Sequence, residues 1–185
     1  MPTLTIRDPL LASFAPRLAA LEPRTRAAVA GVPDEKLHAT PPGGGWSMAQ
    51  AFEHLCIANT SYVVPITRSI ATARTRKGPP RTHRPTLFGG LLAGALAESN
   101  VKKLRAPKIF VPLEPRANVV EEFLSSLRWL DQRVQEADGL DLRVMMSSPV
   151  ASFLRLNLGE ALVIEVIHAE RHLGQVERTR QAVGA

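Results

Sequence analysis

A short polar stretch close to the C-terminus constrains the fold of this chain more than any other feature. It runs Glu165-Val-Ile-His168-Ala-Glu-Arg-His172-Leu-Gly-Gln175, with His168 and His172 four residues apart. On an α-helix, that spacing stacks two side chains on one face, one turn apart. Two imidazoles placed in this way can share one metal ion. The same spacing also occurs in surface histidines and in hydrogen-bonded core histidines, so the surrounding residues must decide.

The residues around the two histidines favour the metal-binding interpretation. When positions 161–176 are placed on a helical wheel, Glu165, His172 and Gln175 fall within about 60° of His168. Apolar residues flank this polar stripe on both sides, so it runs through the face that should pack against a core. Buried polar groups must be paired, and neutral histidines that share a metal ion meet this requirement.

A third ligand has to come from elsewhere in the chain, and His54 is the candidate. It lies in Ala51-Phe-Glu-His54-Leu55, inside the only other strongly helical run that contains a histidine. On its own helical wheel it has small neighbours, which leave space beside the imidazole. Taken alone, His54 would be interpreted as a hydrogen-bonded core histidine. His38 and His83 lie in expected loops and receive no role.

Short motifs occur in a fixed order along the chain. They are Trp46-Ser47, Glu53-His54-Leu55, the run Ala106-Pro-Lys-Ile-Phe110-Val-Pro112, and a late H-x3-H-x2-Q formed by His168, His172 and Gln175. Together they resemble the DinB-like (damage-inducible) superfamily over nearly the whole chain. The resemblance implies an all-α, four-helix bundle with a divalent metal held by three histidines, one from the second helix and two from the fourth. These ligands correspond to His54, His168 and His172. Histidine accepts zinc, nickel, iron or copper, and we expect zinc or nickel, with iron as the alternative.

Two polar residues beside the histidines are candidate catalytic groups. Glu165, one turn before His168, could accept a hydrogen bond from a ligand's second ring nitrogen, bind the metal or act as a base. Its alternative is a carboxylate at the edge of the core, paired with an arginine. Gln175 could orient a bound water or cap a neighbouring carbonyl. Glu53 is expected on the surface, and Cys56 is expected to be buried filler because it points about 200° away from His54.

The resemblance implies an enzyme but leaves its reaction open. Three histidines leave coordination positions free, which is the pattern of catalytic metal sites. Some relatives transfer or isomerise substrates with a low-molecular-weight thiol such as mycothiol, bacillithiol or glutathione, and others look like metal-dependent hydrolases. We expect a divalent-metal-dependent enzyme acting on a small molecule, and a thiol-dependent transferase is one interpretation of its reaction. A metal-dependent hydrolase and a non-catalytic metal or ligand binder are the alternatives. Many relatives are dimers, and an exposed apolar stripe on the first or third long helix would permit a homodimer here.

Length and composition predict one domain over residues 1–185. Hydrophobic residues make up 45% of the chain, an ordinary share for a soluble globular protein. The sequence contains no run of about 18 apolar residues, and its N-terminus lacks the apolar core of a signal peptide. The single cysteine, Cys56, excludes an internal disulfide. These features favour the cytoplasm, with no membrane association.

The excess of positive charge is localised. The net charge is +6, and the segment from Arg68 to Lys108 contains ten basic residues but one acidic residue, Glu98. Such a segment could attract nucleic acid or an anionic small molecule, or it could be a solvated loop. Because only Phe88 and Phe110 supply aromatic rings there, we do not expect nucleic acid as a partner.

Four long helices are expected. The first begins at Asp8-Pro9, should be kinked or divided at Pro16 and Pro23, and ends near Gly31. The others are expected over residues 47–74, with a kink at Pro65, and over residues 116–137 and 157–181.

Recognisable signals support these boundaries. Ser47 and Gln50 form a capping box, Asn157 is an N-cap, and Asp138-Gly139 stops the third helix. Between the long helices we expect a loop over 75–85, a short helix within 87–104, an extended segment over 106–115 and a connection over 140–156.

Overall fold

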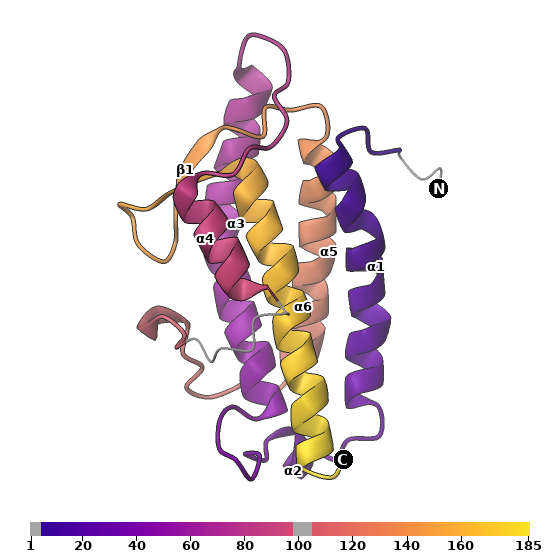
Figure 1. Ribbon diagram of the computed structural model, residues 1–185. Coiled ribbons are helices and arrows are strands. Elements are labelled where there is room, and N and C mark those ends of the chain that lie inside the picture. Colours follow the sequence, from indigo (N-terminus) through magenta and orange to yellow (C-terminus); the bar gives the residue numbers. More distant parts are fainter. Residues whose placement is uncertain (1–4, 98–104) are drawn as a thin grey trace.

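The computed structural model describes residues 5–97 and 105–185 and shows four long helices arranged as a bundle (Figure 1). The long helices are α1 (Pro9–Val29), α3 (Met48–Thr75), α5 (Val119–Ala137) and α6 (Leu158–Ala182). The short elements are α2 (Asp34–Leu37), α4 (Leu87–Leu96), the 3₁₀ turn η1 (Lys108–Phe110), β1 (Met145–Ser147) and β2 (Arg155–Asn157). The predicted all-α, four-helix-bundle fold is confirmed, with one small antiparallel β1–β2 hairpin added.

Capping boxes fix the starts of the two helices that carry the histidines. The Ser47 hydroxyl accepts from the Gln50 backbone N–H at 3.1 Å, and the Gln50 side chain accepts from the Ser47 N–H at 3.0 Å. Asn157 and Glu160 exchange the equivalent bonds at 2.9 and 2.8 Å. Each box satisfies two backbone donors that have no partner inside the helix, so α3 and α6 begin where the sequence predicts.

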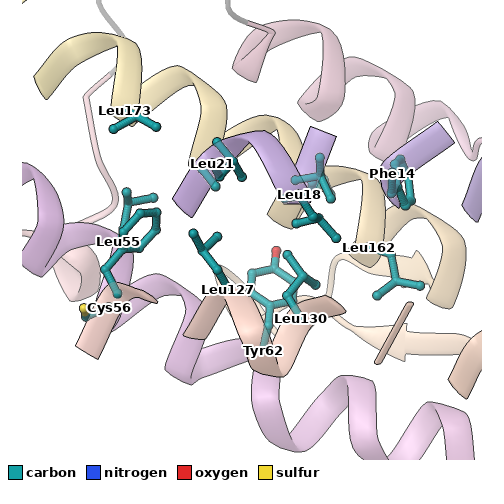
Figure 2. Close-up of a cluster of buried hydrophobic side chains, with 14 of the residues drawn as sticks. Phe14, Leu18, Leu21, Leu55, Cys56, Tyr62, Leu127, Leu130, Leu162 and Leu173 are labelled. Carbon is teal, nitrogen blue, oxygen red and sulfur yellow. The ribbon is translucent and has the colours of Figure 1, made fainter. Parts of the chain in front are cut away.

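The apolar faces of the long helices meet in one cluster. α3 packs against α6 and α5, and α1 packs against α5 and α6. Figure 2 shows Leu18 and Leu21 of α1 close to Leu55 of α3 and to Leu127 and Leu130 of α5. Removing each such side chain from water stabilises the fold by about 1.5–3 kcal/mol. α4 lies along α6 on the outside of the bundle (Figure 1).

The first helix, predicted to be kinked or divided, is not divided. α1 continues from Pro9 to Val29 through Pro16 and Pro23. Both prolines lie on the exposed side of α1, while Phe14 and Leu18 face the core. A proline removes one hydrogen bond to the carbonyl four residues earlier. On this side the freed carbonyls can face water, so the helix tolerates both prolines.

The connections differ from the sequence prediction in three places. The segment expected to be extended over 106–115 contains η1, where the Phe110 N–H donates to the Pro107 carbonyl at 2.8 Å. α5 begins at Val119 rather than near residue 116, and the connection over 140–156 contains the β1–β2 hairpin. The predicted short helix is confirmed as α4, and the remainder of its expected range, 98–104, lies outside the described residues.

The large hydrophobic side chains that the described residues expose are confined to a few places. No helix in the described ranges is long and apolar enough to cross a membrane. The most exposed large hydrophobic side chains include Leu87 and Leu91 of α4 and Phe153 of the hairpin loop. Within the described residues, none of these exposed side chains lies on α1 or α5, and the homodimer stays a prediction.

Part of the basic segment is neutralised by acids that follow it in the chain. Arg76 and Arg81 both reach the Asp141 carboxylate, at 3.2 and 2.8 Å, and Arg74 reaches Glu136 at 3.2 Å. These arginines tie the last turn of α3 and the residues after it to the last turn of α5 and the residues after it. They therefore contribute to the fold as well as to surface charge.

Candidate metal centre

Three histidines from two helices meet between α3 and α6. His54 projects from α3, and His168 and His172 project from α6. One ligand nitrogen from each lies within 4.8 Å of the other two. The Nε2 atoms of His54 and His168 are 3.0 Å apart, and the His172 ring centroid is 4.6 Å from both other rings. When the His, Cys, Asp and Glu side chains of residues 5–97 and 105–185 are compared, these three histidines form the group that could hold a metal ion.

The backbone of η1 fixes the orientation of His54. Its Nδ1 atom lies 2.7 Å from the Phe110 carbonyl oxygen. A carbonyl can only accept, so Nδ1 carries the proton and donates it, which leaves the Nε2 lone pair directed at the other histidines. Metal-binding histidines are oriented by partners of this kind. Sequence reasoning missed this role of Phe110, although the residue lies in the motif over 106–112.

Gln175 fixes His172 in the same way. The Nδ1 atom of His172 lies 2.9 Å from Oε1 of Gln175, one turn along α6. The amide oxygen accepts the Nδ1–H bond, so Nε2 of His172 is the nitrogen with a free lone pair. Gln175 therefore contacts the ring of a candidate ligand rather than a neighbouring carbonyl. Its predicted catalytic role stays a prediction.

The three imidazoles fit a divalent metal ion. Zinc–nitrogen bonds of about 2.0–2.1 Å at a tetrahedral angle place two ligand nitrogens about 3.4 Å apart. The nitrogens here bracket that value, from 3.0 Å for one pair to an upper limit of 4.8 Å. Burial lowers the pKa of His54, lowers that of His168 well below its ordinary value and lowers that of His172 to about 3. All three are therefore neutral near pH 7, the form that binds metals.

Trp46 covers the cluster. Its ring centroid lies 4.7 Å from that of His54 and 6.0 Å from that of His172. The two preceding glycines, Gly44 and Gly45, have φ values of +72° and +109°. Side chains rarely adopt this left-handed region, so the glycines allow the turn that brings Trp46 to the histidines.

Glu165 is buried beside the cluster without joining it. Its side chain is 1% exposed, and Oε1 has no hydrogen-bond partner within the described residues. Burial raises its pKa to about 8. No arginine in the described part of the chain pairs with it, so the arginine-paired alternative is wrong. Its carboxylate also lies outside the metal-ligand group, and its predicted role as a base stays a prediction.

The surface prediction for Glu53 is wrong. Glu53 is 4% exposed, and its carboxylate accepts from the Arg116 guanidinium at 2.7 and 3.0 Å and from the Arg116 backbone N–H at 3.1 Å. The partner lies 63 residues away, so a helical wheel could not reveal it. The connection before α5 is thus held at two points. Glu53 binds Arg116, and His54 binds the carbonyl of Phe110.

The remaining candidates lie apart from the cluster. Cys56 is confirmed as buried filler: burial raises its thiol pKa to about 12, and its sulfur lies 3.6 Å from the Val119 carbonyl. His38 is partly exposed beside Asp34 at 3.7 Å. His83 packs against Gly159, where a Cβ atom would lie 2.6 Å from its Nδ1 atom.

The three histidines line a cavity of about 970 Å³. The cavity runs along α6, whose wall residues recur every three or four positions from Ile164 to Ala182. The loop before α3, α3 itself, α4, the connection after α4 and Val150 of the β1–β2 connection supply the other walls. This volume is in the range of sites for small molecules.

Comparisons with known proteins agree with the fold. Among solved structures, the chain is similar to YfiT from Bacillus subtilis, described as a probable metal-dependent hydrolase with an unusual four-helix bundle topology. The two share 16% sequence identity with a TM-score of 0.59, and the similarity covers 100% of this chain and 93% of YfiT. At that identity, the likeness is evidence for the fold alone. None of the curated proteins compared with the chain matches it significantly.

The family follows from the sequence match. The model of the DinB superfamily matches residues 17–176, a range that includes α3, α5, most of α1 and α6, and all three histidines. This confirms the resemblance carried by the Trp46, His54 and His168–Gln175 motifs. The chain belongs to the DinB superfamily.

Proposed function

We propose that this protein is a divalent-metal-dependent enzyme whose metal is bound by His54, His168 and His172. The observation that carries the proposal is the convergence of three neutral imidazoles on the wall of a cavity large enough for a small-molecule substrate. Phe110 and Gln175 hold two of the rings with Nε2 available. Three protein ligands leave at least one coordination position open for a reactant.

The proposed reaction is attack of a metal-activated nucleophile on a small electrophile. A divalent ion lowers the pKa of a coordinated water or thiol and polarises a substrate oxygen. Because the three ligands are uncharged, the ion keeps its full charge at the site and favours an anionic nucleophile. Glu165 is the proposed proton acceptor, since it is the acidic residue among the described residues of the cavity wall. Burial raises its pKa to about 8 in the metal-free cavity, and a cation held by the histidines would lower that pKa and favour the carboxylate form that accepts a proton.

Two nucleophiles define two candidate reactions. With water, the enzyme is a hydrolase, the activity described as probable for YfiT. With a low-molecular-weight thiol, it is a transferase, and zinc or nickel bound by nitrogen ligands would hold the thiolate. The cavity volume accommodates a thiol cosubstrate together with an electrophile. We further propose a cytoplasmic enzyme that works as a homodimer and does not bind nucleic acid.

The test begins with metal content. Untagged parent protein should contain about one equivalent of zinc or nickel by elemental analysis, and His54→Ala and His168→Ala should lose it while keeping their helical circular dichroism. His38→Ala is the matched control, because His38 lies on the surface away from the cluster. A parent that stays metal-free after reconstitution with zinc, nickel and iron would refute the proposal.

The metal-loaded protein then distinguishes the reactions. An ester and a halogenated electrophile should be assayed with and without glutathione and cysteine. Turnover without thiol identifies a hydrolase, and turnover that needs thiol identifies a transferase. In either case Glu165→Gln should lower kcat by about 10²–10⁴-fold with little loss of metal, as expected for a general base. Full metal loading with no turnover of either substrate would favour the non-catalytic binder.

A further inference from the structure

Arginines dominate the charge of the cavity. Its described lining contains three arginines, Arg105, Arg171 and Arg178, against one acid, Glu165. Arg178 follows His172 by six residues, about 9 Å along the α6 axis. Arg171 directly precedes His172 and donates to the Ala97 carbonyl at 2.9 Å. Arg171 and Arg178 therefore place positive charge beside the histidines and towards the C-terminal end of α6, and Arg105 adds a third positive charge to the wall from the connection after α4.

The acids of α6 do not neutralise these arginines. Glu170 and Glu177 face α1, where Arg17 and Arg24 bind them at 2.6 and 3.0 Å. Within residues 5–97 and 105–185, no carboxylate forms an ion pair with Arg105 or Arg178. A cleft lined by one sign of charge raises the local concentration of ligands with the opposite sign.

The other end of the cavity is apolar. Ile164 lies one turn before His168 on α6, and Leu92 and Leu96 of α4 line the same cavity. α4 packs along α6 on this side of the bundle (Figure 1). Glu165, the acidic residue at this end, lines the cavity but is only 1% exposed. Along α6 the wall therefore changes from apolar at Ile164, through the histidines, to basic at Arg178.

We propose that the cavity binds an amphiphilic carboxylate whose anionic group contacts Arg105 and Arg178 and whose apolar body extends past the histidines towards Leu92 and Ile164. The planar guanidinium matches a carboxylate through paired N–H donors, which a neutral ligand cannot replace. This inference rests on the proposed function for its placement across the histidines, and it names the substrate class. The binding preference itself requires no metal and no turnover.

Trp46 provides the readout. Its ring contacts the histidines, and the one other tryptophan, Trp129, lines a separate pocket on the α3–α5 side. In a Trp129→Phe background, Trp46 fluorescence should be titrated with 4-phenylbutyrate and with its neutral amide, which has the same apolar body. Protein treated with chelator removes any contribution of a bound metal. The carboxylate should bind about tenfold more tightly than the amide.

A double variant tests whether Arg105 and Arg178 cause the preference for the carboxylate over the amide. Arg105→Gln/Arg178→Gln should reduce carboxylate affinity about tenfold and leave amide affinity within twofold. The control, Arg68→Gln/Arg128→Gln, removes the same charge from exposed positions that do not line the cavity. Equal loss in both variants, equal affinity for the two ligands, or no binding of either would overturn the inference. Because the titration uses metal-free protein, such a failure is distinct from a missing metal or missing turnover.

Discussion

At the scale of single residues, the free ring nitrogens of the cluster depend on two hydrogen-bond acceptors. The Phe110 carbonyl and the Gln175 amide oxygen each accept a hydrogen bond from the Nδ1–H of a histidine, which directs Nε2 inward. One acceptor is a backbone group and the other is a side chain. Only the side chain can be removed by substitution.

Gln175→Ala should weaken metal binding by about 10–100-fold, because the His172 ring loses the partner that fixes its tautomer and orientation. Competition with a chromophoric chelator measures this change. The fold should be preserved, since Gln175 bonds to His172 and not to the core. Gln132→Ala on α5 is the matched control. Unchanged affinity in Gln175→Ala would show that the ring is held by other contacts.

The histidines could be predicted from sequence because their signal is local. A polar stripe within an apolar helical face indicates that His168 and His172 point inward, and the motif order adds His54. The roles of Phe110 and Glu53 could not be predicted in this way. A backbone carbonyl has no residue-type signature, and the partner of Glu53 is distant in sequence. Glu165 was predicted near the site, but whether its Oε1 atom finds a hydrogen-bond partner among the described residues depends on what the other helices bring next to it.

At the scale of elements, the connection before α5 is part of the site. η1 supplies the carbonyl that orients His54, and Arg116 binds Glu53, the residue before His54. Two neighbouring residues of α3 thus hold this connection at two points. Displacement of the connection would move the Phe110 carbonyl away from His54.

Glu53→Gln should therefore loosen this connection and weaken metal binding several-fold. The substitution leaves Arg116 without its carboxylate partner, and we expect a stability loss of about 2 kcal/mol because Glu53 is buried but Arg116 is partly exposed. Amide hydrogen exchange over residues 105–118 and urea unfolding measure the two effects. The control is Glu136→Gln, whose carboxylate binds Arg74 and Arg133 away from the site. Unchanged exchange over 105–118 would contradict the argument.

Element boundaries could be predicted where side chains mark them. The capping boxes at Ser47 and Asn157 place the starts of α3 and α6 correctly because they act over three residues. The two prolines do not divide α1, since the cost of a proline depends on which side of the helix it occupies. The β1–β2 hairpin has strands of three residues, too short for an alternating pattern to show.

At the scale of the whole molecule, the bundle encloses a titratable cluster that the metal-free protein must keep neutral. Burial lowers the pKa of His172 to about 3, against 6.5 for an exposed histidine. Well above pH 6.5, His172 is neutral in both the folded and the unfolded chain. As the pH falls from 6.5 towards 3, the unfolded chain binds a proton that the folded chain excludes, so acid lowers the free energy of unfolding.

For the chelator-treated protein, this linkage predicts the effect of His172→Gln. At pH 4 the pH is about 2.5 units below the pKa of His172 in the unfolded chain but still above its pKa in the folded chain. Each pH unit in this interval favours unfolding by about 1.4 kcal/mol, so His172 alone should lower the free energy of unfolding by about 3 kcal/mol between pH 7 and pH 4. Between pH 7 and pH 4, the free energy of unfolding of His172→Gln should therefore fall by about 3 kcal/mol less than that of the parent. Urea unfolding at each pH measures this difference. His38→Gln should retain the parent's acid sensitivity, because His38 lies outside the buried cluster.

Zinc should raise the stability of the parent at pH 7, because it binds the neutral rings of the folded protein, and this stabilisation should be lost on acidification. Equal acid sensitivity in His172→Gln and parent would show that the ring is accessible to protons in the folded state, and that the cluster is more open than its burial implies.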